Sequence, residues 1–170
     1  MELAAYLVWA LEDTRGRTVK FMGEVTQEEF RWRPGPNCNS IGSMAIHIGK
    51  VEDVVSGRPL GFAATVWQSG GWAKKLGVAE DDWGWGFDKL TPAAQVTPQA
   101  VLEYLNAVHA RVIPAIKALT PAKLDEEVKG RTPRTVSQAL WTLATEELQH
   151  LGQMDYLRGM KRNLGGAMPK

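Results

Sequence analysis

The chain has 170 residues, of which 44% are hydrophobic and 23% are charged, and its formal net charge is +1. These values are typical of one globular domain, and the near-balance of charge excludes the basic surface of a nucleic-acid-binding or membrane-surface protein. The densest basic stretch, residues 158–162, lies in the last turn of a predicted helix, where cations favour the helix dipole.

The sequence shows no sign of export or membrane insertion. Its N-terminal apolar run lacks the basic start and the cleavage site of a signal peptide. No apolar stretch reaches the about 18 residues that span a bilayer. The single cysteine, Cys38, has no internal disulfide partner, which fits a reducing compartment. We therefore expect residues 1–170 to form a single domain in the cytoplasm.

The first half of the chain contains two predicted helices. Apolar residues at helical spacing predict the first over about residues 2–23, and the Pro- and Gly-containing stretch 26–39 predicts a connection. Ser40 is a suitable N-cap for a second helix, which is expected to end near Gly57 and Pro59.

A long connection follows the second predicted helix. Residues 60–97 show no sustained periodicity and contain tryptophan at positions 67, 72, 83 and 85. Connections of this length tend to be functional or to carry short helices of their own. Two hypotheses stay open for the tryptophans: they wall an apolar substrate pocket, or half or more of them cover the end of the bundle.

Two more helices are predicted in the second half. Pro98 is suited to the first position of the third helix, and Pro114 is expected to kink that helix. Thr135 and Gln138 form a capping box for a fourth helix over about 136–161. With no convincing strand, the pattern predicts an all-α four-helix bundle with a long Trp-rich connection between helices 2 and 3.

Polar groups interrupt the predicted inward faces of two helices. On the fourth helix, Glu147 lies nearest the centre of the apolar stripe, and Glu146 is offset to the same side as His150 and Gln153. On the second helix, His47 lies at the edge of the stripe. A buried face excludes such groups unless something pairs with them.

A metal ion is one suitable partner. Imidazole and carboxylate groups bind zinc, nickel or ferrous iron, and three protein ligands leave a position open for water or substrate. Glu146 and His150 are four residues apart and so lie one above the other, and His47 can add a third ligand. The alternative is that His47 is a hydrogen-bonded core residue and that the E-x-x-x-H spacing arises by chance.

The other candidate functional residues have weaker support from the sequence. The spacing Glu147-x-x-His150 occurs in ferritin-like di-metal bundles, but these need the motif twice, and here Asn106 stands three residues before His109. Because His109 has no carboxylate in register, we expect it on the surface. Cys38 lies beside a predicted turn and is interpreted as a bystander, with thiol reactivity left open.

Two segments resemble the DinB/YfiT-like superfamily of metal-binding bundle proteins: RWRPGPNCNSIGSMAIHIGKVED (31–53) and ATEELQHLGQMDYLRG (144–159). The similarity includes the W-R-P-x-P loop, the N-S-I-G start of the second helix, and H-I-x-x-x-E within it. It also includes H-x-G-Q-x-x-x-L-R in the last helix. The resemblance covers nearly the whole chain.

The resemblance implies a site for one divalent metal ion, often zinc or nickel, held by His47, Glu146 and His150. In this superfamily a histidine of the second helix and two residues four apart on the last helix usually bind the ion. Glu146 stands where the commonest pattern has histidine. Some relatives, including mycothiol-dependent maleylpyruvate isomerase-like proteins, have glutamate there, and others have histidine where Gln153 stands.

The resemblance also implies a function. Characterised relatives include enzymes that use low-molecular-weight thiols such as bacillithiol or mycothiol as co-substrates. The chain is therefore expected to be a metal-dependent thiol S-transferase, or a hydrolase, acting on a small-molecule substrate. The alternative is a non-catalytic metal-binding stress-response protein. No catalytic residue is assigned.

Two further expectations concern contacts of the fourth helix. A homodimer formed through bundle faces is expected for two reasons: dimers are common in the superfamily that the chain resembles, and Trp141 and Leu148 point outward from the fourth helix. Glu147 is expected to point away from the metal site and to need its own partner. An arginine of the first helix, Arg15 or Arg17, is suitable.

Overall fold

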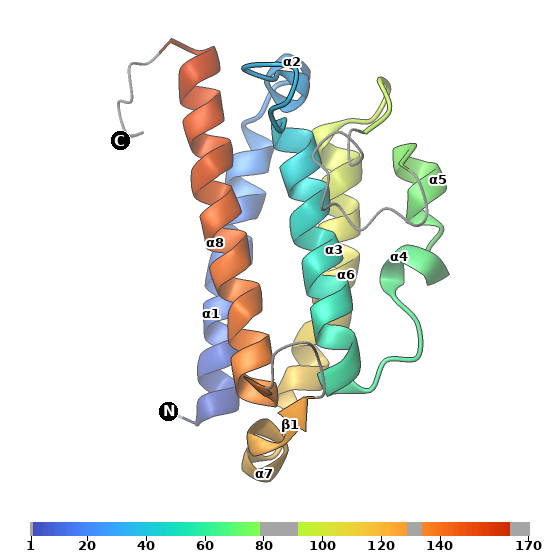
Figure 1. The fold of residues 1–170 in the computed structure, drawn as a ribbon, viewed down its shortest axis with the longest axis vertical. Helices are drawn as coiled ribbons and strands as arrows, with labels where there is room; N and C mark the ends of the chain where they lie inside the picture. Colours follow the sequence, from blue (N-terminus) through green and yellow to red (C-terminus); the bar gives the residue numbers. More distant parts are fainter. Residues whose placement is uncertain (1, 79–91, 129–133, 164–170) are drawn as a thin grey trace.

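The computed structural model describes residues 2–78, 92–128 and 134–163. Within these ranges four long helices form a bundle, as predicted: α1 (Leu3–Gly23), α3 (Ile41–Leu60), α6 (Pro98–Lys117) and α8 (Val136–Lys161) (Figure 1). Helices α1 and α8 run in one direction, and α3 and α6 run in the other. Both α1 and α3 pack against α6 and α8, so each long helix turns one face toward a common core.

Helix α3 begins where the sequence predicts and ends at Leu60, one residue after Pro59. The Ser40 side chain accepts a hydrogen bond from the backbone N–H of Ser43, which caps the N-terminus. The helix then continues through Pro59 and stops at Gly61, whose φ of 73° is in the left-handed region that favours glycine. A proline near the end of a helix removes one hydrogen bond, and here it does not terminate the helix.

The starts of α6 and α8 agree with the predicted caps. Thr97 caps α6 ahead of Pro98, and the helix continues past Pro114 to its end. Thr135 and Gln138 form the predicted capping box of α8. These local signals fix where α8 begins and therefore which of its residues lie level with the middle of α3.

Short elements occupy the connections. Helix α2 (Gln27–Arg31) lies in the predicted connection after α1, and α7 (Pro121–Asp125) follows α6. Strands β1 (Glu127–Val128) and β2 (Arg134–Thr135) form an antiparallel pair. No strand was expected there, because a two-residue strand is too short to show alternation in the sequence.

The described part of the Trp-rich connection contains α4 (Val66–Ser69) and α5 (Trp72–Leu76), as expected for a long connection. Helix α4 packs on α3 and α6, and α5 packs on α6 (Figure 1). Both carboxylate oxygens of Asp53 accept backbone N–H groups at the start of α4, from Val66 and Trp67, at 2.8 Å each. These two bonds hold α4 against α3.

The two tryptophans of this connection that the structure describes cover the bundle. Trp67 and Trp72 are buried, and their rings lie 5.2 and 5.4 Å from the ring of Tyr104 on α6. Trp83 and Trp85 lie outside the described residues, so for these two the choice between a pocket wall and a cover over the bundle stays open. None of the helices in the described ranges is long and apolar enough to cross a membrane.

Candidate metal centre

The three predicted metal ligands come together between α3 and α8. His47 projects from α3, and Glu146 and His150 project from successive turns of α8. One ligand atom from each side chain lies within 4.8 Å of the other two. All three residues are half-buried, so the cluster is reachable from solvent.

The spacing of the two ligand atoms on α8 fits a single small cation. His150 Nε2 lies 3.5 Å from Glu146 Oε2. A tetrahedral ion with bonds of about 2.0–2.2 Å holds its ligand atoms roughly 3.3–3.6 Å apart. The rings of His47 and His150 meet edge to face, with centroids 4.8 Å apart and planes at 81°. Two imidazoles and one carboxylate are a donor set that zinc, nickel and ferrous iron accept.

The surroundings of His47 favour the form of the ring that binds metals. Burial lowers the pKa of His47, and the nearby His150 lowers it further, while Glu146 acts in the opposite direction. A histidine must be unprotonated at one nitrogen to coordinate a metal. The cluster therefore presents His47 as a neutral ligand at neutral pH.

The adjacent Glu147 has a different partner, as the sequence analysis expected. Its carboxylate accepts hydrogen bonds from Arg15 of α1, with Nε–Oε1 at 3.0 Å and Nη2–Oε2 at 3.2 Å. Arg15 and Glu147 are almost fully buried, with 4% and 3% of their side chains exposed. Arg17, the other candidate, pairs instead with Asp13 on the exposed face of α1.

The Arg15 pair extends into a polar network at the centre of the bundle. Arg15 Nη2 also donates to Glu52 Oε2 of α3 at 2.6 Å, and Glu52 Oε1 lies 3.2 Å from His109 Nδ1 of α6. Each long helix thus contributes one side chain. Burial raises the pKa of Glu147, and the positive charge of Arg15 acts against that rise.

The expectation that His109 is a surface residue is wrong. Its side chain is 17% exposed and has a carboxylate partner, Glu52. Sequence reasoning missed this contact because it looked for a carboxylate on the same helix, whereas Glu52 comes from α3. The available signal was a glutamate on the inward side of α3, five residues after His47.

Cys38 lies in a turn, as expected, closed by a hydrogen bond from its N–H to the carbonyl of Gly35. It is half-buried and has a free thiol. Among the described residues, Cys38 is not part of a group of side chains that could hold a metal ion.

Fold and cluster together define a helical-bundle protein with a candidate site for one divalent cation. The DinB superfamily matches residues 10–154, which is most of the chain, and the protein therefore belongs to the DinB superfamily. This confirms the family resemblance carried by the two sequence segments.

The comparison with solved structures agrees on the fold. The crystal structure of a conserved protein from Enterococcus faecalis is similar, with a TM-score of 0.79 and 20% sequence identity. The match covers 94% of this chain and 96% of that one. A comparison with curated proteins gave no significant match. The likeness at this identity establishes the fold and not the activity.

Proposed function

We propose that the protein binds one divalent metal ion per chain through His47, Glu146 and His150. The observation that carries this proposal is the convergence of the three side chains from two helices, with ligand atoms within 4.8 Å of one another. The half-buried carboxylate of Glu146 lies beside the imidazole of His150, and a bound cation would give this carboxylate a positive partner. The nitrogen-rich donor set favours zinc or nickel over magnesium or calcium.

We further propose that the site serves the transfer of a low-molecular-weight thiol, of the bacillithiol or mycothiol type, to a small electrophilic substrate. A bound divalent cation lowers the pKa of a coordinated thiol or water and thus supplies a nucleophile at neutral pH. Three protein donors leave a coordination position open. Glu146 and His150, with 34% and 17% of their side chains exposed, leave room for a second molecule to approach.

The first experiment measures metal binding. Chelator-treated protein is titrated with zinc and with nickel, and the bound metal is counted. The proposal predicts one ion per chain, with strong loss of affinity in His47→Gln. His109→Gln is the matched control, because it removes a partly exposed histidine outside the cluster. If neither metal binds, or if His47→Gln binds like the wild type, the proposal fails.

The second experiment measures thiol chemistry. Metal-loaded protein is titrated with small thiols by calorimetry and is then mixed with a chromogenic electrophile and each thiol. Transferase function predicts thiol binding and conjugate formation that both disappear in His47→Gln. Metal binding without either result favours the non-catalytic metal-binding alternative.

A further inference from the structure

A glutamine outside the three-residue cluster contacts one of the candidate ligands. Gln153 follows His150 by one turn of α8, and its Oε1 atom lies 2.8 Å from His150 Nδ1. On the other side of the ring, His150 Nε2 lies 3.5 Å from Glu146 Oε2. Glu146, His150 and Gln153 therefore form a row along α8 in which both ring nitrogens of the histidine have an oxygen neighbour.

The chemistry of the amide determines where the ring proton sits. A glutamine Oε1 atom only accepts hydrogen bonds, so the Nδ1 atom that meets it must carry the proton. A neutral imidazole has one N–H, and Nε2 is then left with a free lone pair. That lone pair lies on the side of Glu146, where the cluster gathers its ligand atoms.

We propose that Gln153 is a positioning residue for the metal centre. It selects the Nδ1–H tautomer of His150 and leaves the Nε2 atom free to bind the metal. This inference rests on the proposed metal site and extends it to a residue outside the ligand set. Metal-binding histidines commonly donate their second ring N–H to an oxygen, which fixes the ring and raises the basicity of the ligating nitrogen. Here that oxygen belongs to a side-chain amide three residues further along the same helix.

The contact also explains how an exposed stretch of α8 holds its ligand in place. His150 is held at Nδ1 by Gln153, and the ring of His47 packs across it at 81°. A ring fixed in this way does not lose rotational freedom when it binds a metal, so its affinity rises. Removal of the amide oxygen frees the ring to rotate and to exchange tautomers.

The test uses Gln153→Leu, which removes the acceptor, and Gln153→Glu, which replaces it with a stronger one. Gln149→Leu is the matched control, because Gln149 is an exposed glutamine one turn earlier on the same helix. The first readout is the tautomer of His150 in metal-free full-length protein. Long-range proton–nitrogen NMR at mildly alkaline pH reports it, and only three histidines contribute signals.

We expect Nδ1–H in the wild type, Gln149→Leu and Gln153→Glu, and a marked rise of Nε2–H in Gln153→Leu. The second readout is zinc affinity by competition with a chelator. Gln153→Leu should bind about 10- to 100-fold more weakly, the size typical of a lost partner of a metal ligand. Gln153→Glu should restore the affinity, and Gln149→Leu should leave it unchanged.

Two results would overturn the inference. One is an Nε2–H tautomer of His150 in the wild type, which would mean that the amide donates to Nδ1. The other is equal zinc affinity of Gln153→Leu and Gln149→Leu. Failure of the proposed function is distinguishable, because wild-type protein would then bind no zinc while the metal-free NMR measurement still reports the tautomer.

Discussion

At the scale of single residues, neighbouring glutamates of one helix have opposite surroundings. Glu146 is 34% exposed and faces His150, whereas Glu147 is 3% exposed and binds Arg15. Adjacent residues of an α-helix point about 100° apart, so a helix between two neighbours offers one residue to each. The pair therefore divides into a candidate metal ligand and a member of the buried ionic network.

We predict that Arg15→Ala strongly destabilises the protein. The substitution leaves the carboxylates of Glu52 and Glu147 buried without their cation, and loss of one partner of a buried ion pair typically costs about 3–5 kcal/mol. Urea unfolding followed by circular dichroism measures the change. A loss below about 1 kcal/mol would show that the network contributes little.

A triple variant separates charge imbalance from lost packing. Arg15→Met combined with Glu52→Gln and Glu147→Gln removes all three charges and keeps the side-chain volumes similar. Because neutral replacement of a buried ionic group is often tolerated, this variant should recover much of the stability lost in Arg15→Ala. If both proteins are equally unstable, packing around Arg15 and not charge balance explains the loss.

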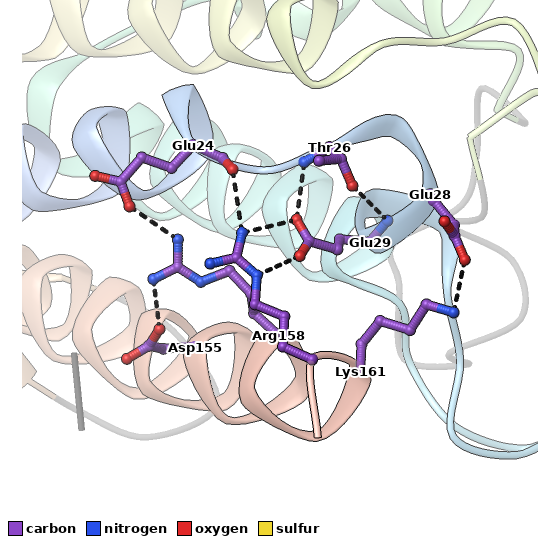
Figure 2. Close-up of polar contacts among 8 residues, drawn as sticks. Glu24, Thr26, Glu28, Glu29, Asp155, Arg158 and Lys161 are labelled. Carbon is purple, nitrogen blue, oxygen red and sulfur yellow. Dashed lines mark hydrogen bonds and ion pairs between the residues drawn. The ribbon is translucent and has the colours of Figure 1, made fainter. Parts of the chain in front are cut away.

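At the scale of elements, ion pairs connect the corner between α1 and α2 to the C-terminal end of α8 (Figure 2). Arg158 lies between Glu24 and Asp155, at 3.1 and 2.8 Å. Lys161 lies 2.7 Å from Glu28. The basic stretch 158–162, expected to favour the helix dipole of α8, thus also binds acidic groups of another part of the chain.

Glu29 is the most buried carboxylate of this connection. It accepts hydrogen bonds from Arg162 and from the N–H of Thr26, which it caps at the start of α2. The hydrogen bond from Arg162 lowers the pKa of Glu29, and burial opposes this effect. A lowered pKa in the folded state means that the carboxylate stabilises the fold above its unfolded pKa of about 4.3 and loses this effect in more acidic solution.

We predict that Glu29→Gln destabilises the protein at neutral pH and that the difference from wild type shrinks as the pH falls below about 4. Unfolding free energies measured across the acidic range test this. Glu28→Gln is the matched control, since Glu28 is 77% exposed and surface ion pairs contribute about 0–1 kcal/mol. A pH-independent difference between Glu29→Gln and wild type would contradict the prediction.

The long helices were predictable from the sequence, and the short elements were not. Periodicity and caps such as Ser40 and Thr135 predicted the long helices, because these signals are local. Helix α2 and the β1–β2 pair were not predicted, because they are too short for a period to appear. The end of α3 at Leu60 lies one residue after Pro59, close to the predicted end, and the helix accommodates the proline.

The sequence predicted the residues of the candidate site but not every contact around them. Helix position and family resemblance indicated His47, Glu146 and His150, and the charge of Glu147 required a cation such as Arg15. The contact of His109 with Glu52 depends on how α3 and α6 pack, which no local pattern reports.

At the scale of the whole molecule, α1 and α8 together expose an aromatic surface. We name this surface the α1–α8 face and define it by Tyr6, Trp9, Trp141 and Leu148. All four side chains are exposed, and the ring of Tyr6 lies 5.8 Å from that of Trp9 and 6.5 Å from that of Trp141. Exposed apolar side chains gathered on one face in this way mark interaction sites.

We predict that the α1–α8 face is the contact of a homodimer. A two-fold symmetric pair buries the same patch on both copies and needs no second surface. Light scattering should give a dimer mass for the wild type and a monomer mass for Trp141→Glu. The exposed Gln149→Glu on the same helix should remain dimeric. A monomeric wild type, or a dimeric Trp141→Glu, would contradict this prediction.

The central claim is that Glu146, and not its neighbour, completes a metal site with His47 and His150. The most direct measurement is the rise in unfolding temperature that zinc or nickel causes in wild type, Glu146→Gln, Glu147→Gln and Glu146→His. An ion at 100 times its Kd stabilises the folded state by about 2.7 kcal/mol. For a chain of this size that corresponds to roughly 2–4 °C for each kcal/mol.

Wild type, Glu147→Gln and Glu146→His should each show this metal-dependent rise, even where a substitution lowers the starting temperature. Glu146→Gln should show little or none, because it removes a direct ligand. The account is contradicted if Glu147→Gln abolishes the rise and Glu146→Gln leaves it intact.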